Sequence, residues 1–185
     1  MSRNKIALSF ALAGILGAST ALAENEGWFV GGYLTQQQIK TESNAWFYSG
    51  TTTEIKYGIL GGYHQGLGED LGIRYYGAGD LGAHTTNLSA NVDVLYSFLK
   101  NESVELRGFG GGWLGYANHS TDSVSGFDLG INLGVRAVFA EKHGAELYGH
   151  FGFLTQDKEY STFGGTTTLK LSQPYQIGLR YTFSF

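Results

Sequence analysis

The sequence ends on the stretch Tyr175-Gln176-Ile177-Gly178-Leu179-Arg180-Tyr181-Thr182-Phe183-Ser184-Phe185, in which two kinds of side chain alternate. One parity carries Tyr, Ile, Leu and Phe, and the other carries Gln, Gly, Arg, Thr and Ser. An alternation with a period of two predicts a β-strand with one apolar and one polar face. The apolar face is aromatic at both ends and the polar face is charged, which is typical of a strand between lipid and a polar lumen.

Seven earlier segments show a similar alternation, and we predict a strand in each. They span about 27–37, 54–64, 71–79, 88–98, 104–116, 127–139 and 145–155. The links after the second, fourth and sixth segments are short, whereas the other links are longer and richer in Ser, Thr and Asn. Outer-membrane barrels have an even number of strands, short periplasmic turns and longer external loops. We therefore predict an all-β protein, an eight-stranded antiparallel up-and-down transmembrane β-barrel with both termini in the periplasm.

Aromatic residues are expected at the two rims of this barrel. Those predicted for the periplasmic rim are Trp28, Phe29, Tyr63, Phe98, Phe139, Phe183 and Phe185, and those for the outer rim are Tyr116, Phe127 and Phe153. A soluble eight-stranded barrel is the alternative, but it would turn the apolar parity inward and would leave the aromatic rims without a purpose.

The composition supports a small closed sheet and excludes several classes of function. The 185 residues include 29 Gly and one Pro, and 15% are aromatic. Because there is no cysteine, disulfides, thiol catalysis and thiolate metal sites are excluded. A net charge of -4 lacks the basic footprint that nucleic-acid binding requires.

The first residues have the pattern of a secretory signal peptide. Arg3 and Lys5 precede an apolar region from Ile6 to Leu16, and Ala21-Leu22-Ala23 is an Ala-x-Ala cleavage site. We therefore expect residues 1–23 to be the signal peptide and residues 24–185 to form the outer-membrane β-barrel domain. No later run reaches the roughly 20 apolar residues of a transmembrane helix.

The polar faces of the predicted strands carry charges of both signs, which we expect to form a lumen charge network. Its members are Lys56, Arg74, Asp93, Glu105, Arg107, Asp128, Arg136, Glu146 and Arg180. The interior of an eight-stranded barrel is just wide enough for side chains, so these charges must pair. A salt-bridged plug is the simpler interpretation, and a selective pore or a proton path is the alternative.

Three further groups of residues are possible sites. The five histidines show no metal-ligand spacing, so we predict no metal site and no cofactor. A hydrolase triad at an outer rim could use His119, Ser120 and Asp122, but neighbouring residues of a strand point to opposite faces, and we predict no catalytic residue. The run Trp46-Phe47-Tyr48 in a polar link is a candidate loop-binding site, or it enters the outer leaflet.

The start of the predicted barrel, Gly27-Trp28-Phe29-Val30-Gly31-Gly32-Tyr33, and its end, Gly178 to Phe185, resemble small bacterial outer-membrane barrels of the eight-stranded class that includes the OmpA transmembrane domain and OmpX. The entry Phe-Val-Gly-Gly also resembles the Helicobacter and Campylobacter outer-membrane protein families. The resemblance implies that Tyr181, Phe183 and Phe185 are the signal read by the barrel assembly machinery.

We expect a non-enzymatic protein of the bacterial outer membrane with a structural and surface-interaction role. Its expected partners are outer-membrane lipid and lipopolysaccharide, the barrel assembly machinery, and host surfaces or other envelope proteins, without nucleic acid. A small pore is the first alternative, and a lipid A-modifying enzyme is the second.

Overall fold

The computed structural model describes residues 26–43, 49–101, 104–119, 124–162 and 165–185, and these residues form nine β-strands. The strands are β1 (Gly27–Ser43), β2 (Ser49–Gly66), β3 (Leu71–Leu81), β4 (Thr85–Lys100), β5 (Val104–His119), β6 (Val124–Phe139), β7 (His143–Gly152), β8 (Thr155–Thr162) and β9 (Gly165–Ser184). Within these ranges, no helix is long and apolar enough to span a membrane.

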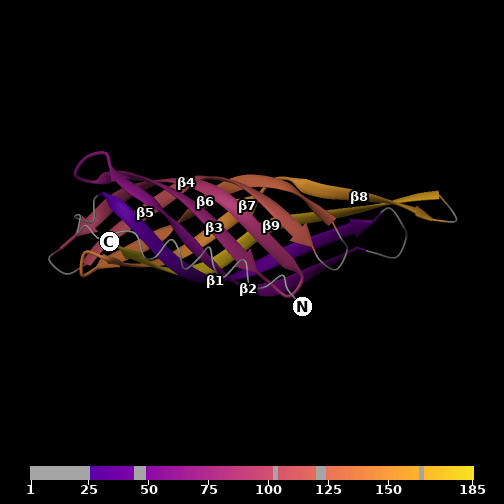
Figure 1. Cartoon of the computed structure of the whole chain (residues 1–185), viewed down its shortest axis with the longest axis horizontal. Coiled ribbons are helices and arrows are strands. Elements are labelled where there is room, and N and C mark those ends of the chain that lie inside the picture. Colours follow the sequence, from indigo (N-terminus) through magenta and orange to yellow (C-terminus); the bar gives the residue numbers. More distant parts are fainter. Residues whose placement is uncertain (1–25, 44–48, 102–103, 120–123, 163–164) are drawn as a thin grey trace.

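The strands close into a barrel because β1 pairs with β2 on one side and with β9 on the other (Figure 1). All pairings are antiparallel. The second half of β9 pairs with β7 and its first half with β8, so β7 and β8 together form one wall strand. The wall therefore has eight strands, and the predicted fold class is confirmed.

The alternation in the sequence places polar residues inside and apolar residues outside. Ile55 and Tyr57 expose 74% and 62% of their surface, whereas Lys56 between them exposes 0%. The same inversion runs around the barrel, with buried charges and exposed Leu, Ile and Val. A protein surrounded by water buries its apolar side chains instead. The outer face of this wall therefore suits a hydrocarbon environment.

Aromatic residues gather at the end of the barrel where β1 begins and β9 ends, called the base below. Trp28 packs edge-on against Tyr63 with ring centroids 5.4 Å apart, and Phe139 stacks on His143 at 5.4 Å. The predicted rim position of Phe29 is wrong. Phe29 has the parity opposite to that of Trp28, and it lies inside the barrel with 4% of its surface exposed.

The strands are longer than predicted at the end opposite the base, called the top. The sequence led us to expect a polar link over residues 39–53, yet β1 continues to Ser43 and β2 already begins at Ser49. These extensions pair with each other and with β9 and β8 in the order β2-β1-β9-β8. They form the projecting sheet, made of residues 38–43, 49–54, 155–162 and 165–172. Its lower part, with Ile39 and Leu171, still packs with Val124 of β6, and its outer part extends beyond the barrel (Figure 1).

The only proline marks the level at which the barrel wall passes into the projecting sheet. Pro174 lies in β9 where the pairing with β1 shifts from Gln38–Tyr175 to Lys40–Ser172. Proline has no N–H group to donate, so it is tolerated at such a bulge. Residues 153–154, which separate β7 from β8, lie at the same level, because the pairing of β9 passes there from β7 to β8.

The turn between β6 and β7 holds two residues in a strained backbone conformation. Ala140 and Glu141 have φ angles of 49° and 60°, in the left-handed region. A residue with a Cβ atom is disfavoured there, whereas glycine adopts this region freely.

We expect Ala140→Gly to raise the free energy of unfolding by about 1 kcal/mol, because it removes this strain. The matched substitution Ala145→Gly, inside strand β7, should lower it by about 0.5–1 kcal/mol. Urea unfolding in detergent micelles measures both values. A midpoint that Ala140→Gly lowers, as Ala145→Gly does, would contradict an energetic cost of the backbone strain at Ala140.

Candidate functional site in the barrel lumen

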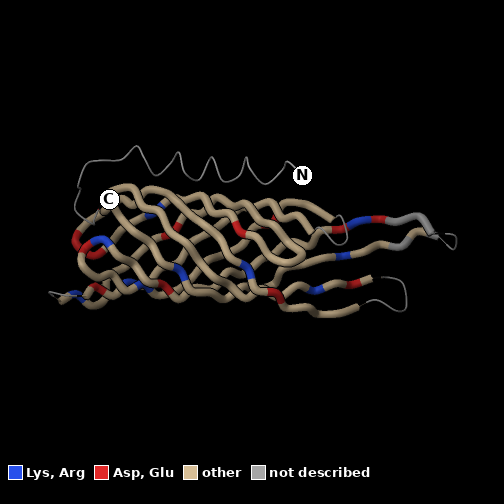
Figure 2. The backbone as a smooth tube through the Cα atoms, turned by 60° about the horizontal axis from the view of Figure 1, so that its bottom comes forward, with Lys and Arg blue, Asp and Glu red and all other residues tan. Residues whose placement is uncertain are grey.

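All nine residues of the predicted lumen charge network lie inside the barrel, and each exposes less than a tenth of its surface. Their exposed fractions are 0% for Lys56 and Asp93, 1% for Asp128, 2% for Arg74, 3% for Glu146 and Arg180, 5% for Arg107, 7% for Arg136 and 8% for Glu105. Charged positions occur on strands around the barrel as well as on the projecting sheet (Figure 2).

Glu146 of β7 is the centre of the network. Its Oε1 accepts hydrogen bonds from Arg74 at 2.5 Å and from Arg136 at 2.6 Å, and its Oε2 accepts one from Arg180 at 3.0 Å. These arginines come from β3, β6 and β9, so one carboxylate ties together strands on different sides of the lumen. Charge-assisted hydrogen bonds of this kind are roughly twice as strong as neutral ones.

Asp93 of β4 is the second carboxylate of this layer. Its Oδ2 accepts from Arg74 Nε at 3.0 Å and Nη2 at 2.9 Å, and its Oδ1 accepts from the amide of Asn132 at 2.8 Å. Arg74 therefore bridges two acids. The layer still has more cations than anions, because Arg136 and Arg180 share Glu146 with Arg74.

Aromatic rings next to the arginines offset part of this excess positive charge. The Arg74 guanidinium lies 4.7 Å from the ring centroid of Phe109, and that of Arg180 lies 4.2 Å from Tyr148. Tyr76 is within 5.1 Å of both guanidinium groups. The negative faces of aromatic rings attract cations, more strongly where water is excluded.

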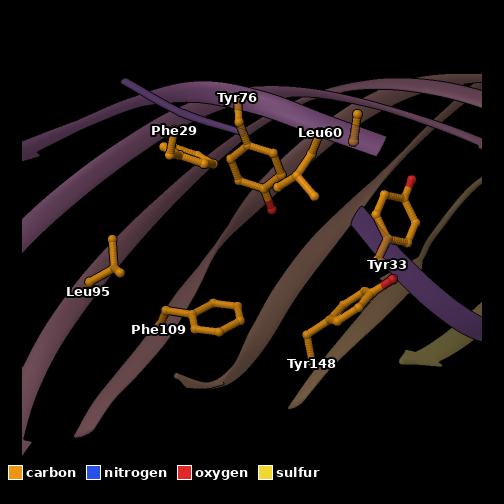
Figure 3. Packing of buried hydrophobic residues seen from close by; sticks show 8 residues of the cluster. Phe29, Tyr33, Leu60, Tyr76, Leu95, Phe109 and Tyr148 are labelled. Carbon is orange, nitrogen blue, oxygen red and sulfur yellow. The ribbon is translucent and has the colours of Figure 1, made fainter. Parts of the chain in front are cut away.

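These rings belong to a buried apolar cluster inside the lumen, which Figure 3 shows from close by. Its members are Phe29, Tyr33, Leu60, Tyr76, Ala78, Leu95, Phe109 and Tyr148. The lumen of this barrel is thus a packed interior that contains both charged and aromatic layers.

Nearer the top, Lys56 forms an ion pair with Asp80, which also accepts a hydrogen bond from the Tyr33 hydroxyl at 3.0 Å. Asp80 is absent from the predicted network because the predicted third strand stops at residue 79. The parity of Arg74, Tyr76 and Asp80 is the signal that would have found it. Glu54 lies within the predicted second strand and has the same parity as Lys56, which is the signal that would have placed it in the network.

Asp128 was expected to pair with a base, but no ion pair of Asp128 occurs among the described residues. Its Oδ1 accepts backbone N–H groups from Leu129 at 2.8 Å and from Leu154 at 3.1 Å. These backbone hydrogen bonds satisfy Oδ1 at the break between β7 and β8, whereas Oδ2 is buried without a hydrogen-bond partner among the described residues. Glu54 acts similarly at the β3–β4 link, where it accepts the N–H of His84 at 3.0 Å and the hydroxyl of Thr85.

Side chains fill both ends of the lumen. At the base, Arg107 donates to Glu105 at 2.7 Å, and Ser97 also bonds to Glu105. At the top, Ile39, Val124 and Leu171 form an apolar layer, each with 6% or less of its surface exposed. A cavity near Tyr33 has a volume of about 20 Å³, and another near the base has a volume of about 10 Å³. Each is about the size of one water molecule.

Of the other candidate site residues, only some lie within the described ranges. His119 is buried with its Nε2 3.1 Å from the Gln173 amide, whereas Ser120 and Asp122 lie outside the described residues. The run Trp46-Phe47-Tyr48 and the predicted signal peptide 1–23 also lie outside them. Within the described ranges, no group of three or more His, Asp or Glu side chains is placed to hold a metal ion.

The predicted assembly signal lies at the base, at the end of β9. Tyr181 faces outward with 47% of its surface exposed, and the rings of Phe183 and Phe185 meet edge-on at 5.5 Å. The Phe185 N–H donates to the Trp28 carbonyl at 3.0 Å and so ties the chain end to β1. Recognition of these residues by the assembly machinery stays a prediction.

Comparisons with known proteins agree on the fold. No protein-family model matches the sequence, and no curated protein matches it. The outer membrane protein OprG from Pseudomonas aeruginosa is similar in structure, with a TM-score of 0.53, 9% sequence identity, and coverage of 88% of this chain and 97% of that one. Neisserial surface protein A has a TM-score of 0.47 and 13% identity, with 86% and 97% covered. At these identities the likeness concerns the fold alone.

We expect Glu146→Gln to lower the free energy of unfolding by about 3–5 kcal/mol, because three buried arginines lose their shared counter-charge. Glu159→Gln, on an exposed side chain of β8, is the matched control and should change it by less than about 0.5 kcal/mol. Urea midpoints in detergent micelles give the comparison. Equal midpoints for the two variants would show that the lumen network contributes no stability.

Asp128→Ala should loosen the break between β7 and β8, because backbone N–H groups lose their acceptor, at about 1–3 kcal/mol for each group left unsatisfied. Amide hydrogen exchange at Leu154 is expected to accelerate, while exchange at Leu147 in the wall should not change. Asp157→Ala on the exposed face of β8 serves as the control. Unchanged exchange at Leu154 would contradict this role of Asp128.

Proposed function

We propose that this chain is an integral protein of the bacterial outer membrane whose projecting sheet contacts other molecules outside the cell. The proposal has three parts, which are the location of the barrel in the membrane, a lumen that does not conduct, and a binding role for the projecting sheet. Its termini would face the periplasm, and the barrel assembly machinery would insert it. Membership of the Helicobacter or Campylobacter outer-membrane families is a narrower form of the same proposal.

The membrane location is supported by the apolar outer wall. Residues such as Leu88, Leu179 and Ile177 expose more than half of their surface, as the outer face of a barrel in hydrocarbon requires. The closure of the sheet through β1 and β9 also supports it, since unpaired backbone groups are not tolerated in lipid. OprG, whose structure is similar with a TM-score of 0.53, is described as an outer membrane protein.

The surface role rests on one observation, the continuation of four strands above the barrel as the projecting sheet. The pairing of β1 with β9 persists as far as Ser43 and Leu169, and that of β8 with β9 as far as Thr162 and Gly165. Membrane insertion does not need strands of this length, because about 9–11 residues span the hydrocarbon. In the proposed location, the extra length would hold an ordered surface beyond the bilayer.

The projecting sheet has two edges with different side chains, and the β8 edge is open beyond Gln156, which bonds to the Gly126 carbonyl of β6. On one side β2 pairs with β3 only from Tyr57 onward, so no described strand pairs with residues 49–56 on that side. This edge carries the uncharged run Thr51-Thr52-Thr53, whereas the edge formed by β8 carries Asp157, Lys158 and Glu159. Charges on an edge strand discourage pairing with other chains. The β2 edge is therefore the surface that we propose adds an extended strand of a host or envelope protein.

The alternatives have less support. A conducting pore needs a water path, whereas this lumen is filled by the Glu146 cluster and by the apolar layer of Ile39, Val124 and Leu171. A lipid A-modifying enzyme needs reactive side chains at an outer rim, whereas His119 is buried in the lumen beside Gln173.

Two measurements test the proposal. In planar bilayers, the purified barrel should produce no discrete conductance steps at any voltage, and such steps would favour the pore. Adhesion of bacteria to host-cell layers should fall in Thr52→Lys cells to the level of cells without the protein, because a lysine on the β2 edge opposes strand addition.

The matched control for adhesion is Thr155→Lys, which makes the same change on the β8 edge and should leave adhesion intact. Surface exposure of each variant is checked by antibody labelling of whole cells. Equal adhesion by the wild type and both variants would contradict the proposed role of the β2 edge.

A further inference from the structure

The outer wall of the barrel is hollowed by a groove of about 770 Å³ that crosses from β1 to β5. Its outward-facing floor consists of small residues, and its borders are aromatic or aliphatic. The floor residues are Gly61, Gly77, Ala90 and Gly112, and the border residues are Trp28, Tyr63, Tyr75, Val92 and Leu114. The pairings of Gly77 with Gly61 and with Ala90 make the floor continuous across three strands.

The packing of the chain does not require glycine at the floor of this groove. A Cβ atom added to the inward-facing Gly111 or Gly130 would lie 2.0 or 1.9 Å from a backbone carbonyl oxygen, so those positions must be glycine. At Gly77 and Gly112 the nearest atoms would be 3.9 and 3.7 Å away, which is ordinary contact. Glycine weakens a strand, so its use here has a cost without a packing reason inside this chain.

The groove rises obliquely from the base into the wall. It starts beside Trp28, directly after the first residue of β1, and it ends at Leu114, in the interior of β5. It is continuous with the apolar surface that the fold presents to lipid. An acyl chain whose headgroup lies at the base would follow this path.

A second copy of the chain fits the groove poorly. A twofold dimer brings the same patch of both subunits together, so two hollows would face each other across the axis. Such a contact leaves an unfilled space and loses the dispersion contacts of a packed interface. A flexible hydrocarbon chain fills a hollow of this shape without that loss.

The charges at the lower end of the groove select the headgroup. Glu26 accepts a hydrogen bond from the Tyr63 hydroxyl at 3.3 Å, and Glu69 and Asp70 lie in the link that follows β2. Lys100 is at the same end, where its ammonium group lies 3.6 Å from the Glu105 carboxylate and donates to the Glu69 carbonyl at 3.5 Å, so the acids still outnumber the bases there. An ammonium-bearing headgroup is attracted by these acids, whereas a headgroup with a net negative charge is repelled.

We propose that the groove binds one acyl chain of an amine-bearing, zwitterionic phospholipid of the phosphatidylethanolamine class, with its amine near Glu26. The inference rests on the proposed membrane location of the barrel. It assigns to the β1–β5 wall a lipid site distinct from the lumen and from the projecting sheet.

Native mass spectrometry of the whole barrel tests the site, with phosphatidylethanolamine and phosphatidylglycerol of identical chains titrated separately. The wild type should retain phosphatidylethanolamine in preference to phosphatidylglycerol. The variant Gly77→Leu/Ala90→Leu fills the groove and should bind phosphatidylethanolamine about fivefold more weakly. Glu26→Gln should reduce the headgroup preference.

The matched control is Gly108→Leu/Gly110→Leu, which adds the same bulk to outward-facing positions of β5 outside the groove, where a Cβ atom has its nearest neighbour 3.8 Å away or more. This variant should bind like the wild type. Equal retention of the two lipids by the wild type, unchanged binding by the filled variant, or a dimer that the filled variant loses would overturn the proposal.

Flotation of the wild-type protein with liposomes is measured first, so that a failure of the membrane location is distinguished from a failure of the lipid site. A protein that does not float with liposomes overturns the membrane location and the lipid site together. A protein that floats but shows no lipid preference overturns the lipid site alone.

Discussion

The closure of the sheet between β1 and β9 is the constraint on which the rest of this structure depends. Their ladder runs from Phe29–Ser184 to Ser43–Leu169, so the first and last strands leave no open edge in the wall. In hydrocarbon an unpaired backbone group costs several kcal/mol, and only a closed barrel lets strands satisfy all of them. Closure also turns one face of every strand inward, which produces the polar lumen.

The lumen has to be filled, and the barrel fills it with charges that satisfy one another. Glu146 is placed where Arg74, Arg136 and Arg180 from three other strands converge. Removing Glu146 would leave buried arginines without their shared counter-charge, so the cluster favours the arrangement in which these strands face each other. Aromatic rings such as Tyr76 complete the layer, because they pack like apolar groups and still attract guanidinium cations.

The top and the outer wall differ from this interior. The top has strand edges that no described strand pairs with, and the outer wall has an unfilled groove. The projecting sheet continues the ladders of the wall but loses closure above Tyr57, which leaves edges that other strands can join. The groove over Gly77 leaves space on a wall where a larger side chain would fit. The core of the barrel is thus complete, and these are the two surfaces on which the proposed contacts depend.

The sequence by itself determined the strand number, the closed barrel and the inward direction of Lys56 or Glu146, because a period of two assigns every side chain to a face. Tertiary structure decided which charges meet, since the register around the barrel brings Arg74 and Glu146 together from strands far apart in the chain. It also decided that Asp128 bonds to backbone groups, and that β1 and β2 continue into the projecting sheet. Polar segments carry no apolar alternation, so their strand pairing depends on neighbours that the linear pattern does not name.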